Sequence, residues 1–428
     1  MGCRLDLLAA GALPPGLCRD RRNLRDRNVM SAHLMNTYGR LPVAFARGEG
    51  VWLWDTEGKR YLDGLSGIAV TGLGHAHPRL TRALTEQAGR ILHASNLYRI
   101  PEQERLADLL CELSGMDNAF FCNSGCEANE AAIKLARLYG HQKGIEQPTV
   151  VVMEKAFHGR TIATLSATGS RKVQAGFEPL LSGFARVPYN DPQAVDLVAA
   201  NNKNVVAVLV EPIQGEGGVN VPDDGYLSYL RQLCDRQGWL LMVDEVQTGI
   251  GRTGRWFAHQ LLHIQPDVMT LAKGLGNGVP IGACLARGPA ARVFQPGNHG
   301  STFGGNPLAC TAAYTALQII ADDDLLENAV RMGKLIRALL HEDLGELPGL
   351  RQIRGRGLMV GIDLDRPCND VVTAGLERGL LINVTADTVV RLLPPLILQP
   401  AQARQLAQGV AGVIRAFLAE PASAALNH

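Results

Sequence analysis

The sequence has no marked excess of charge of either sign and no long hydrophobic run. Its 42 Lys and Arg residues nearly balance 41 Asp and Glu residues, which gives a formal net charge of +1. Such a balance gives no sign of a basic surface for nucleic acid or of an acidic tail. Gly, Pro or charged residues interrupt the apolar stretches before they reach membrane-spanning length. We therefore expect neither nucleic acid nor a membrane as a partner.

The sequence also lacks the cysteine pattern of a disulfide-bonded or zinc-binding protein. Its nine cysteines are odd in number and scattered through apolar and loop sequence. Cys122 and Cys126 lie close together, but no second Cys or His pair follows at zinc-finger spacing. His75 and His77 lack a third ligand at a recognisable spacing and precede a proline that suits a helix start. We expect no metal, reduced thiols and a reducing compartment, the cytoplasm.

The composition that remains is that of a globular protein long enough for two domains. The chain has 428 residues, of which 46% are hydrophobic and 19% charged. Residues 1–29 stand apart, because a mildly apolar stretch precedes arginines mixed with aspartates, which fits neither a signal peptide nor a transit peptide. We predict that 1–29 is a disordered or extraneous extension and that 30–75 packs with a small domain. Residues 76–309 then form a large domain, and 310–428 form a linker helix and the small C-terminal domain.

Two apolar stretches end on the residues around which we interpret the chain. Residues 240–243 read as a buried strand that delivers Asp244, and residues 267–272 read as a second strand that ends on Lys273. Open α/β sheets bind their ligands at the carboxyl ends of strands. Pyridoxal phosphate needs an amine that forms an imine with its aldehyde and a carboxylate that keeps its ring nitrogen protonated. We therefore interpret Lys273 as the amine and Asp244 as the carboxylate.

A helix that begins directly after another apolar strand supplies a candidate phosphate site. Ser124 and Glu127 have the spacing of a capping box, and an alanine- and leucine-rich helical stripe follows them. Gly125 therefore lies in the first turn of a helix, where free N–H groups and the helix dipole favour an anion. Taken alone, the pattern is that of a well-capped helix and nothing more. Beside Asp244 and Lys273, a phosphate site is the better interpretation.

Two further strand ends carry candidate binding residues. Residues 149–153 form an apolar strand, and after it come Phe157, which can stack on a flat ring, and Arg160, whose planar fork suits a carboxylate. Residues 205–210 form another apolar strand, which ends at Glu211. A carboxylate at the end of a buried strand serves either as an ion-pair partner or as a base. The glycines after Glu211 indicate a tight loop near a ligand.

The C-terminal part, from Leu350 onward, reads as a small α+β unit. Strand-like and helical stretches alternate there, at residues 358–362, 370–378, 380–383, 389–393 and 400–418. Arg391 has apolar residues on both sides, which is unusual for an arginine exposed to solvent. We expect it to pair with a carboxylate, either of the protein or of a substrate.

Seven motifs in the same order give the chain a resemblance to the class III, or ω-amino-acid, aminotransferases. They lie at residues 123–130, 156–160, 210–218, 244–249, 251–254, 272–273 and 300–307. The resemblance covers about residues 34–418. It implies an α/β protein of the aspartate-aminotransferase-like fold type I of pyridoxal-phosphate-dependent transferases. Such a protein has a large domain with a mostly parallel central sheet flanked by helices, and a smaller α+β domain.

The resemblance also implies a role for each site residue. The residues implied to bind pyridoxal 5'-phosphate are Gly125, Cys126, Phe157, Asp244, Glu245, Val246, Gln247, Lys273 and Thr302. Thr302 is implied to reach the phosphate from the neighbouring subunit of a homodimer, and Ser301 is implied to lie near the substrate. Arg160 is implied to hold the α-carboxylate of the amino donor. Glu211 is implied to cover Arg391 while the donor is bound and to move aside when Arg391 binds 2-oxoglutarate.

Members that act on acetylornithine are the most similar, and this similarity implies a reaction. The δ-amino group of N-acetylornithine passes to 2-oxoglutarate, which gives N-acetylglutamate 5-semialdehyde and glutamate, a step of arginine biosynthesis. Lys273 is implied to carry the proton during the transfer. Succinylornithine, ornithine and 4-aminobutyrate remain alternative donors, and aminomutase activity remains an alternative reaction. Cys126 departs from the family, which often has Thr at this position, and the departure removes a side-chain hydroxyl from the phosphate site.

Two readings from other classes of protein remain. The first is a non-catalytic regulator on the same fold, which usually carries an added DNA-binding region. Residues 1–29 show no helix-turn-helix pattern that would support it. The second is a generic nucleotide-binding α/β protein. The sequence lacks both a P-loop and a GxGxxG motif after the first strand, and it therefore disfavours that reading.

Overall fold

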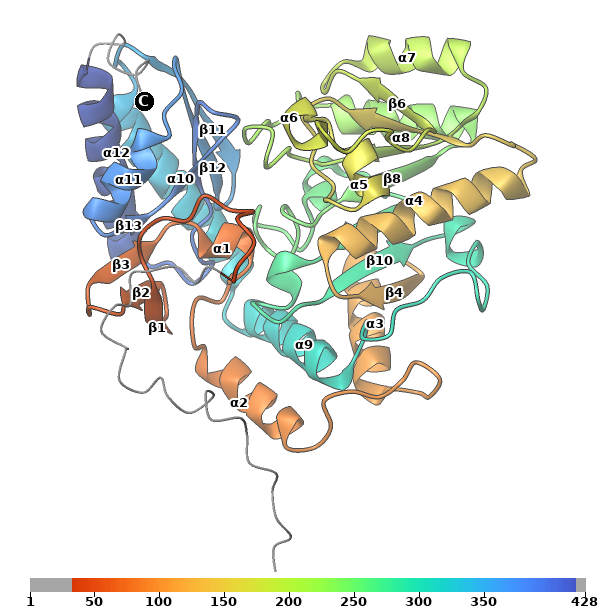
Figure 1. Cartoon of the computed structure of the whole chain (residues 1–428), viewed down its shortest axis with the longest axis horizontal. Coiled ribbons are helices and arrows are strands. Elements are labelled where there is room, and N and C mark those ends of the chain that lie inside the picture. The colour runs from red at the N-terminus through yellow and green to blue at the C-terminus, as the bar shows by residue number, and fades with distance from the viewer. Residues whose placement is uncertain (1–32, 421–428) are drawn as a thin grey trace, which may run out of the picture.

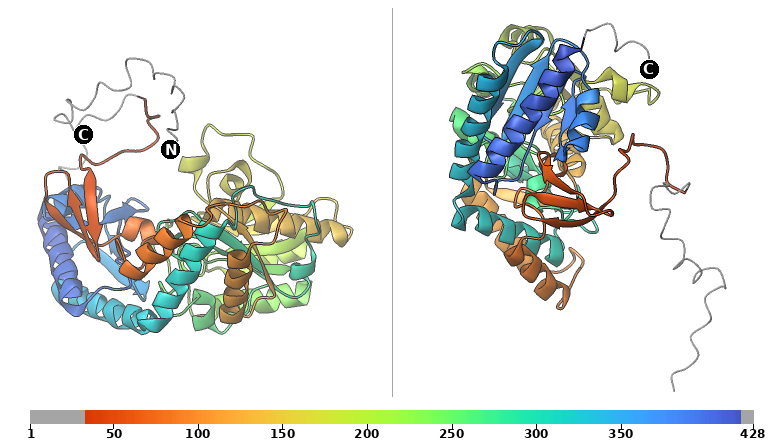
Figure 2. Two further views of the ribbon diagram at one scale, coloured as in Figure 1. Left: turned by 90° about the horizontal axis from the view of Figure 1, so that it is seen from below. Right: turned by 90° about the vertical axis from the view of Figure 1, so that its left-hand side faces the viewer.

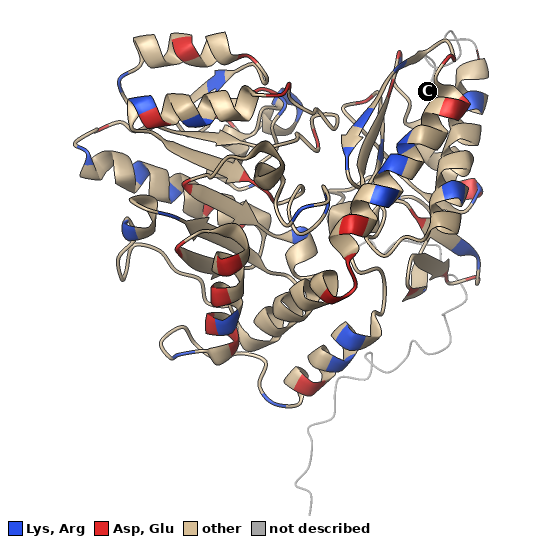
Figure 3. Ribbon diagram, turned by 180° about the vertical axis from the view of Figure 1, so that it is seen from behind, with Lys and Arg blue, Asp and Glu red and all other residues tan. Residues whose placement is uncertain are grey.

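The computed structural model describes residues 33–420, and these form three β-sheets with helices packed around them (Figure 1). The predicted extension at residues 1–29 lies outside the described residues. Among the described residues, no helix is both long and apolar enough to cross a membrane. Basic and acidic residues are interspersed over the outer helices (Figure 3), as expected for a chain with a formal net charge of +1.

The largest sheet has seven strands in the order β4-β10-β9-β8-β7-β5-β6. Its strands are β4 (Asn118–Cys122), β5 (Thr149–Met153), β6 (Phe184–Val187), β7 (Val205–Val210), β8 (Leu240–Asp244), β9 (Val268–Leu271) and β10 (Gly282–Ala286). Strands β6, β5, β7, β8 and β9 are parallel to their neighbours in this run, and β10 is antiparallel to both β9 and β4. The prediction of a mostly parallel central sheet is confirmed, and the carboxyl ends of β4, β5, β7, β8 and β9 meet at one edge.

The central strands of the seven-stranded sheet are almost entirely apolar because helices cover both of its faces. Its flanking helices include α3 (Pro101–Ser114), α4 (Gly125–Gln142), α5 (Ile162–Ala167), α6 (Arg171–Gln174), α7 (Pro192–Asn201) and α8 (Tyr226–Gln237). In β5, Val150 and Val152 pack in the core formed with α4, whereas Val151 and Met153 pack in the core formed with α7 and α8. Successive side chains of a strand point to opposite faces, so both faces of this sheet are buried.

The C-terminal part forms a four-stranded antiparallel sheet covered by helices. The sheet has the order β11-β12-β15-β14. Its elements are β11 (Leu350–Arg356), β12 (Met359–Leu364), β14 (Asn383–Thr385) and β15 (Val389–Leu392), with α10 (Leu325–Leu344), α11 (Asp370–Glu377) and α12 (Pro400–Ala419). The long helix α9 (Pro307–Asp322) leads into α10 from the large-sheet side (Figure 1). The strands and helices predicted after Leu350 are thereby confirmed.

The N-terminal strands join the C-terminal part rather than the seven-stranded sheet (Figure 2). A third sheet consists of β1 (Phe45–Glu49), β2 (Trp52–Asp55), β3 (Arg60–Asp63) and β13 (Leu380–Leu381). β2 and β3 pair antiparallel, which confirms the predicted hairpin, and β13 pairs parallel with β3. The short turn α1 (Ser66–Ala69) and helix α2 (Pro78–Ala88) then lead to the large sheet. The domain boundaries near residues 30, 76 and 310 stay a prediction.

Candidate active site

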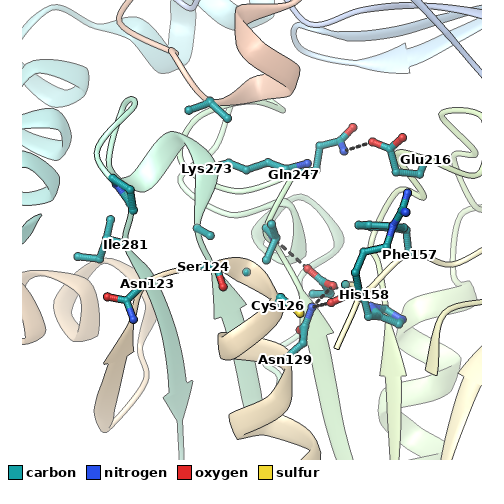
Figure 4. Close-up of a pocket in the computed structure, with 18 of the residues that line it drawn as sticks. Asn123, Ser124, Cys126, Asn129, Phe157, His158, Glu216, Gln247, Lys273 and Ile281 are labelled. Carbon is teal, nitrogen blue, oxygen red and sulfur yellow. Dashed lines mark hydrogen bonds and ion pairs between the residues drawn. The ribbon is translucent and has the colours of Figure 1, made fainter. Parts of the chain in front are cut away.

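The strand ends of the seven-stranded sheet surround a cavity of about 460 Å³, within the size range of small-molecule sites (Figure 4). Nine of the residues singled out from the sequence line it: Gly125, Cys126, Phe157, Arg160, Glu211, Asp244, Val246, Gln247 and Lys273. Val70, before helix α2, and Ile281, before strand β10, also line the cavity. The nine predicted residues come from five separate segments of the chain, which the structure brings together.

Four other predicted site residues lie outside the lining of this cavity. Glu245 turns its carboxylate away, where it accepts hydrogen bonds from the backbone N–H groups of Ala258 (3.0 Å) and His259 (2.8 Å). Thr302 is exposed, and the hydroxyl of Ser301 accepts a hydrogen bond from Asn123 (3.3 Å), which does line the cavity. Arg391 lies behind Glu216 and Gln247 and is described below. The binding roles of these residues stay predictions.

The first turn of α4 forms one end of the cavity. The hydroxyl of Ser124 accepts a hydrogen bond from the N–H of Glu127 (3.2 Å), and the Glu127 carboxylate accepts one from the N–H of Asn123 (2.7 Å). The predicted N-cap at Ser124 is confirmed. Glu127 reaches back to the N–H of Asn123 and not to that of Ser124, so the reciprocal bond of a capping box is displaced by one residue. Helix geometry leaves the first N–H groups without an acceptor inside the helix, so this end attracts an anion. At Gly125 a Cβ atom would lie 2.7 Å from the Val246 side chain, so only glycine allows this close approach.

Asp244 is held in the cavity by two side chains that the sequence interpretation did not anticipate. Its Oδ2 atom lies 2.7 Å from the Nδ1 atom of His158 and accepts a hydrogen bond from Asn129 (2.7 Å). Its Oδ1 atom accepts one from the N–H of Val246 (3.0 Å). Asn129 is itself fixed, because it accepts a hydrogen bond from Thr270 on β9 (2.8 Å). The carboxylate of Asp244 is 4% exposed and has one fixed orientation.

Lys273 follows β9 and extends across the cavity toward Gln247 (Figure 4). It begins the short helix η2 (Lys273–Leu275) with a φ of 48°, a left-handed conformation that is uncommon for a residue with a side chain. Burial lowers the pKa of Lys273 below its ordinary value, and the charges of Glu216 and Asp244 oppose that effect. An amine whose pKa is lowered has a larger uncharged fraction and is a better nucleophile.

The segment after β5 forms a third wall. Gly159 has a φ of 138°, and a Cβ atom there would lie 2.5 Å from the sulfur of Cys126. The Cys126 thiol lies within hydrogen-bonding distance of the hydroxyls of Thr161 (3.3 Å) and Thr164 (3.2 Å). Phe157 and Arg160 both line the cavity, with the guanidinium of Arg160 5.9 Å from the Phe157 ring. An aromatic ring, a close backbone and a cation thus face the same space.

The structure corrects the predicted partner of Arg391. Glu216, not Glu211, binds the guanidinium, with its Oε1 atom 2.6 Å from Nη1 and its Oε2 atom 3.3 Å from Nη2. Gln247 also accepts a hydrogen bond from Nη1 (3.2 Å). Burial tends to raise the pKa of Glu216, but the charge and hydrogen bonds of Arg391 outweigh burial and hold that pKa below its ordinary value. The expectation that buried Arg391 pairs with a carboxylate is confirmed.

Glu211 instead bonds to the backbone at the end of β7. Its Oε1 atom accepts a hydrogen bond from the N–H of Phe157 (2.9 Å), and its Oε2 atom accepts one from the N–H of Gly215 (3.0 Å). Burial, together with the negative charge of Asp244, raises the pKa of Glu211 to about 7, and the neighbouring His158 acts in the opposite direction. In this structure the side chain therefore binds these two backbone groups, and Arg391 is bound by Glu216 instead.

The donors and acceptors of the cavity fit pyridoxal phosphate. An anion site at the start of α4, a fixed carboxylate at Asp244 and a buried amine at Lys273 are the three groups that this cofactor requires. Gly125 and Gly159 leave room where a Cβ atom would collide with Val246 or Cys126. Within residues 33–420, no cluster of His, Cys, Asp and Glu side chains is arranged to hold a metal ion.

Comparison with known proteins agrees with this geometry. The family model described as aminotransferase class-III matches residues 34–414. An acetylornithine aminotransferase of Nitrosomonas europaea is 61% identical over 387 residues, which cover 90% of this chain and 98% of that protein. The chain therefore belongs to the class III aminotransferases and is an enzyme of that class.

Solved structures share the fold over nearly the whole chain. An ornithine aminotransferase from Toxoplasma gondii ME49 has a TM-score of 0.87 and 37% identity, with 91% of this chain and 94% of that chain covered. An acetylornithine aminotransferase from Elizabethkingia anophelis has a TM-score of 0.81 and 36% identity, with 90% and 97% covered. These similarities confirm the fold type I expected from the sequence motifs.

Proposed function

We propose that the enzyme transfers the δ-amino group of N-acetylornithine to 2-oxoglutarate and releases N-acetylglutamate 5-semialdehyde and glutamate. The observation that carries this proposal is the 61% identity to an acetylornithine aminotransferase over 98% of that protein. Two separate arginines suit both substrates, because Arg160 lines the cavity and Arg391 lies directly behind Glu216, and each can hold a carboxylate. We further propose that the enzyme works in the cytoplasm, as a step of arginine biosynthesis.

Pyridoxal 5'-phosphate is the proposed cofactor, and when bound it supplies an electron-withdrawing ring that stabilises negative charge on the substrate carbon. The N–H groups of Gly125 and Cys126 hold the phosphate at the start of α4. Phe157 and Val246 enclose the ring, and Asp244 holds a proton at the ring nitrogen. Because His158 and Asn129 fix the position of Asp244, this interaction requires no rearrangement during the reaction.

Lys273 is the proposed proton carrier. Its Nζ atom takes a proton from the carbon that bears the amino group of the donor. It then gives a proton to the carbon of the cofactor that receives the amino group. Burial favours the uncharged amine, which the first of these steps requires. The turn at Lys273 and the packing of the cavity hold the Nζ atom on one side of the site.

Arg160 and Arg391 are the proposed carboxylate sites. Arg160 lies at the cavity mouth and is exposed, so it can bind the α-carboxylate of the donor. Arg391 is covered by Glu216 in this structure, the arrangement proposed for the donor-binding state. Release of Glu216 frees the planar fork of Arg391 for a carboxylate of 2-oxoglutarate. Of the two members of the ion pair, Glu216 is the one that is free to move, because its side chain is 32% exposed and that of Arg391 is 0% exposed.

We propose a homodimer with shared active sites. Thr302 is exposed and lies outside the lining of its own cavity, which suits a residue that serves a neighbouring subunit. Phe303 beside it is 61% exposed, and exposed large apolar side chains are common where subunits meet. Sedimentation of the cofactor-loaded protein measures the assembly, and a monomer that is fully active would contradict this proposal.

A panel of amines tests the substrate. N-Acetylornithine, N-succinylornithine, ornithine and 4-aminobutyrate are each supplied with 2-oxoglutarate, and the glutamate formed is measured. We expect the highest kcat/KM with N-acetylornithine and parallel lines in initial-rate plots, since both substrates use one site in turn. A higher kcat/KM with another amine would replace the proposed donor, and intersecting lines would contradict the shared site.

A further inference from the structure

Glu211 is a buried carboxylate in the cavity wall for which the proposed reaction gives no task. The side chain is 5% exposed, yet it carries no arginine or lysine partner among its hydrogen bonds. Both oxygens are instead used once each, by two backbone N–H groups that are far apart in the sequence. One belongs to Phe157, after β5, and the other to Gly215, in the loop after β7.

The first of these contacts reaches the ring-binding wall. Phe157 lines the cavity, and its backbone N–H lies 2.9 Å from the Oε1 atom of Glu211. Hydrogen bonds from an N–H to a carboxylate are among the stronger hydrogen bonds in proteins. The position of Phe157, in the segment after β5, therefore depends on the carboxylate of Glu211.

The second contact reaches the cover of Arg391. Gly215 directly precedes Glu216, and its N–H lies 3.0 Å from the Oε2 atom of Glu211. Gly215 also touches Gln247 so closely that a Cβ atom would lie 2.3 Å from the Gln247 Oε1 atom. Gln247 binds both members of the ion pair, through Glu216 Oε1 (3.3 Å) and Arg391 Nη1 (3.2 Å). A movement of Gly215 therefore reaches the ion pair both through the chain, to Glu216, and through the contact with Gln247.

We propose that Glu211 is a positioning residue that holds the loop of Glu216 closed over Arg391 by binding the N–H groups of Phe157 and Gly215. This inference rests on the proposed function, because it assigns Glu211 to the choice between the two substrates. With the loop held, the ion pair stays closed and the site favours the amino donor. With the loop released, Arg391 is uncovered and the site favours substrates that carry a second carboxylate.

Glu211→Gln tests this role with little change of size. The amide retains one acceptor oxygen, but its NH₂ group is a donor and cannot accept from the second N–H. The measurements are made at pH 8, where Glu211 is ionised because its pKa is about 7. The half-reaction of the cofactor-loaded enzyme is measured separately with N-acetylornithine and with L-glutamate as the amino donor. We expect the ratio of the glutamate rate to the N-acetylornithine rate to rise about tenfold, the effect of losing one hydrogen bond to a charged group.

Glu154→Gln is the matched control, since it makes the same chemical change at an exposed side chain beside the same loop. It should leave the ratio at the wild-type value. An equal loss of both half-reactions in Glu211→Gln would overturn the positioning role and leave a purely structural one. If that variant does not fold, Glu211→Asp gives the same test, because the shorter carboxylate cannot reach both N–H groups. An unchanged ratio in a folded Glu211→Asp protein would also overturn the role.

Failure of this inference is distinguishable from failure of the proposed function. If the wild-type enzyme shows no half-reaction with N-acetylornithine, the proposed donor is wrong. If the wild-type enzyme reacts with both donors and the Glu211 variants keep their ratio, the donor stands and the positioning role falls.

Discussion

The two ends of the cavity are held in different ways. At one end, Asp244 is 4% exposed and receives hydrogen bonds from His158, Asn129 and the backbone, all of which belong to the seven-stranded sheet and its helices. At the other end, Glu216 lies on a partly exposed loop and binds Arg391 from the C-terminal sheet. The first end is fixed within one packed unit. The second joins two sheets, through this ion pair and through hydrogen bonds that Thr385 and Arg354 donate to the backbone of Glu216 and Gly218.

This difference matches the demands of a transamination in two halves. The ring and the transferred proton require the same groups in both half-reactions, and fixed groups serve them without reorganisation. The two substrates differ in their carboxylates, so the binding group for one of them must be available in only one half-reaction. A substitution at the fixed end should therefore impair both half-reactions, and one at the ion pair should impair them unequally.

The largest effect is expected from Lys273→Ala, which removes the proton carrier of the fixed end. Both half-reactions should fall by more than about 10⁴-fold, because the variant loses both the nucleophilic amine and the acid–base group. Single-turnover measurements with each substrate check this. Lys172→Ala, at a side chain that is 84% exposed, serves as the control and should be unaffected. A Lys273→Ala protein that retains either half-reaction would contradict the assignment.

A smaller effect on both halves is expected from Asp244→Asn. The amide keeps the shape of the side chain but loses the negative charge that favours a protonated ring nitrogen. We expect kcat to fall by about 10²–10³-fold for either substrate, the usual cost of removing one preorganised electrostatic group. Asp224→Asn, at a 97% exposed side chain, is the control. An effect confined to one half-reaction would contradict the proposal that Asp244 serves both half-reactions.

Arg391→Lys should affect the two half-reactions to different extents. Lysine keeps the positive charge beside Glu216 but cannot bind a carboxylate through two parallel hydrogen bonds. We expect the KM for 2-oxoglutarate to rise about tenfold to hundredfold, while the half-reaction with N-acetylornithine keeps its rate. Arg356→Lys, on the same sheet but 53% exposed, should change neither value. Equal losses in both half-reactions would show that Arg391 does not distinguish the substrates.

The smallest expected effect is a pH dependence of stability that arises at Glu211. Burial raises the pKa of this carboxyl from 4.5 to about 7 on folding, so the folded protein binds the proton more tightly than the unfolded chain. The resulting stability is fully present below pH 4.5 and is lost as the pH rises through about 7. Relative to Glu211→Gln, the wild-type free energy of unfolding should fall by up to about 3 kcal/mol over this range. Urea unfolding at pH 5 and pH 8 measures the difference, and a constant difference would contradict the raised pKa.

Much of the large sheet could be predicted because its signals are local. β5 and β7 match the predicted strands at residues 149–153 and 205–210, since helices cover both faces and every side chain except that of Thr149 is apolar. β10 was not predicted, because Gly282–Ala286 is short and rich in small residues. Its place between β9 and β4 depends on pairing with strands that lie far away in the sequence.

The site was predictable where a residue type and a strand end coincide, as at Asp244 and Lys273. It was not predictable where the choice depends on the course of a loop. Glu211 and Glu216 stand in the same glycine-rich segment, and only the folded loop shows that Glu216 faces Arg391. His158 and Asn129 were also missed as partners of Asp244. Asn129 lies one helical turn after Gly125, on the face of α4 that looks toward the cavity, and that spacing is the signal that could have found it.

The most direct test of the role of Lys273 is to find which side chain joins the cofactor. The protein is loaded with pyridoxal phosphate and treated with borohydride, which makes an imine linkage permanent, and its peptides are then analysed by mass spectrometry. We predict that the cofactor mass is added to the peptide that contains Lys273, and that prior reaction with N-acetylornithine prevents this labelling. Attachment at a different lysine, or labelling that N-acetylornithine does not prevent, would contradict the role of Lys273 as the amine that joins the cofactor.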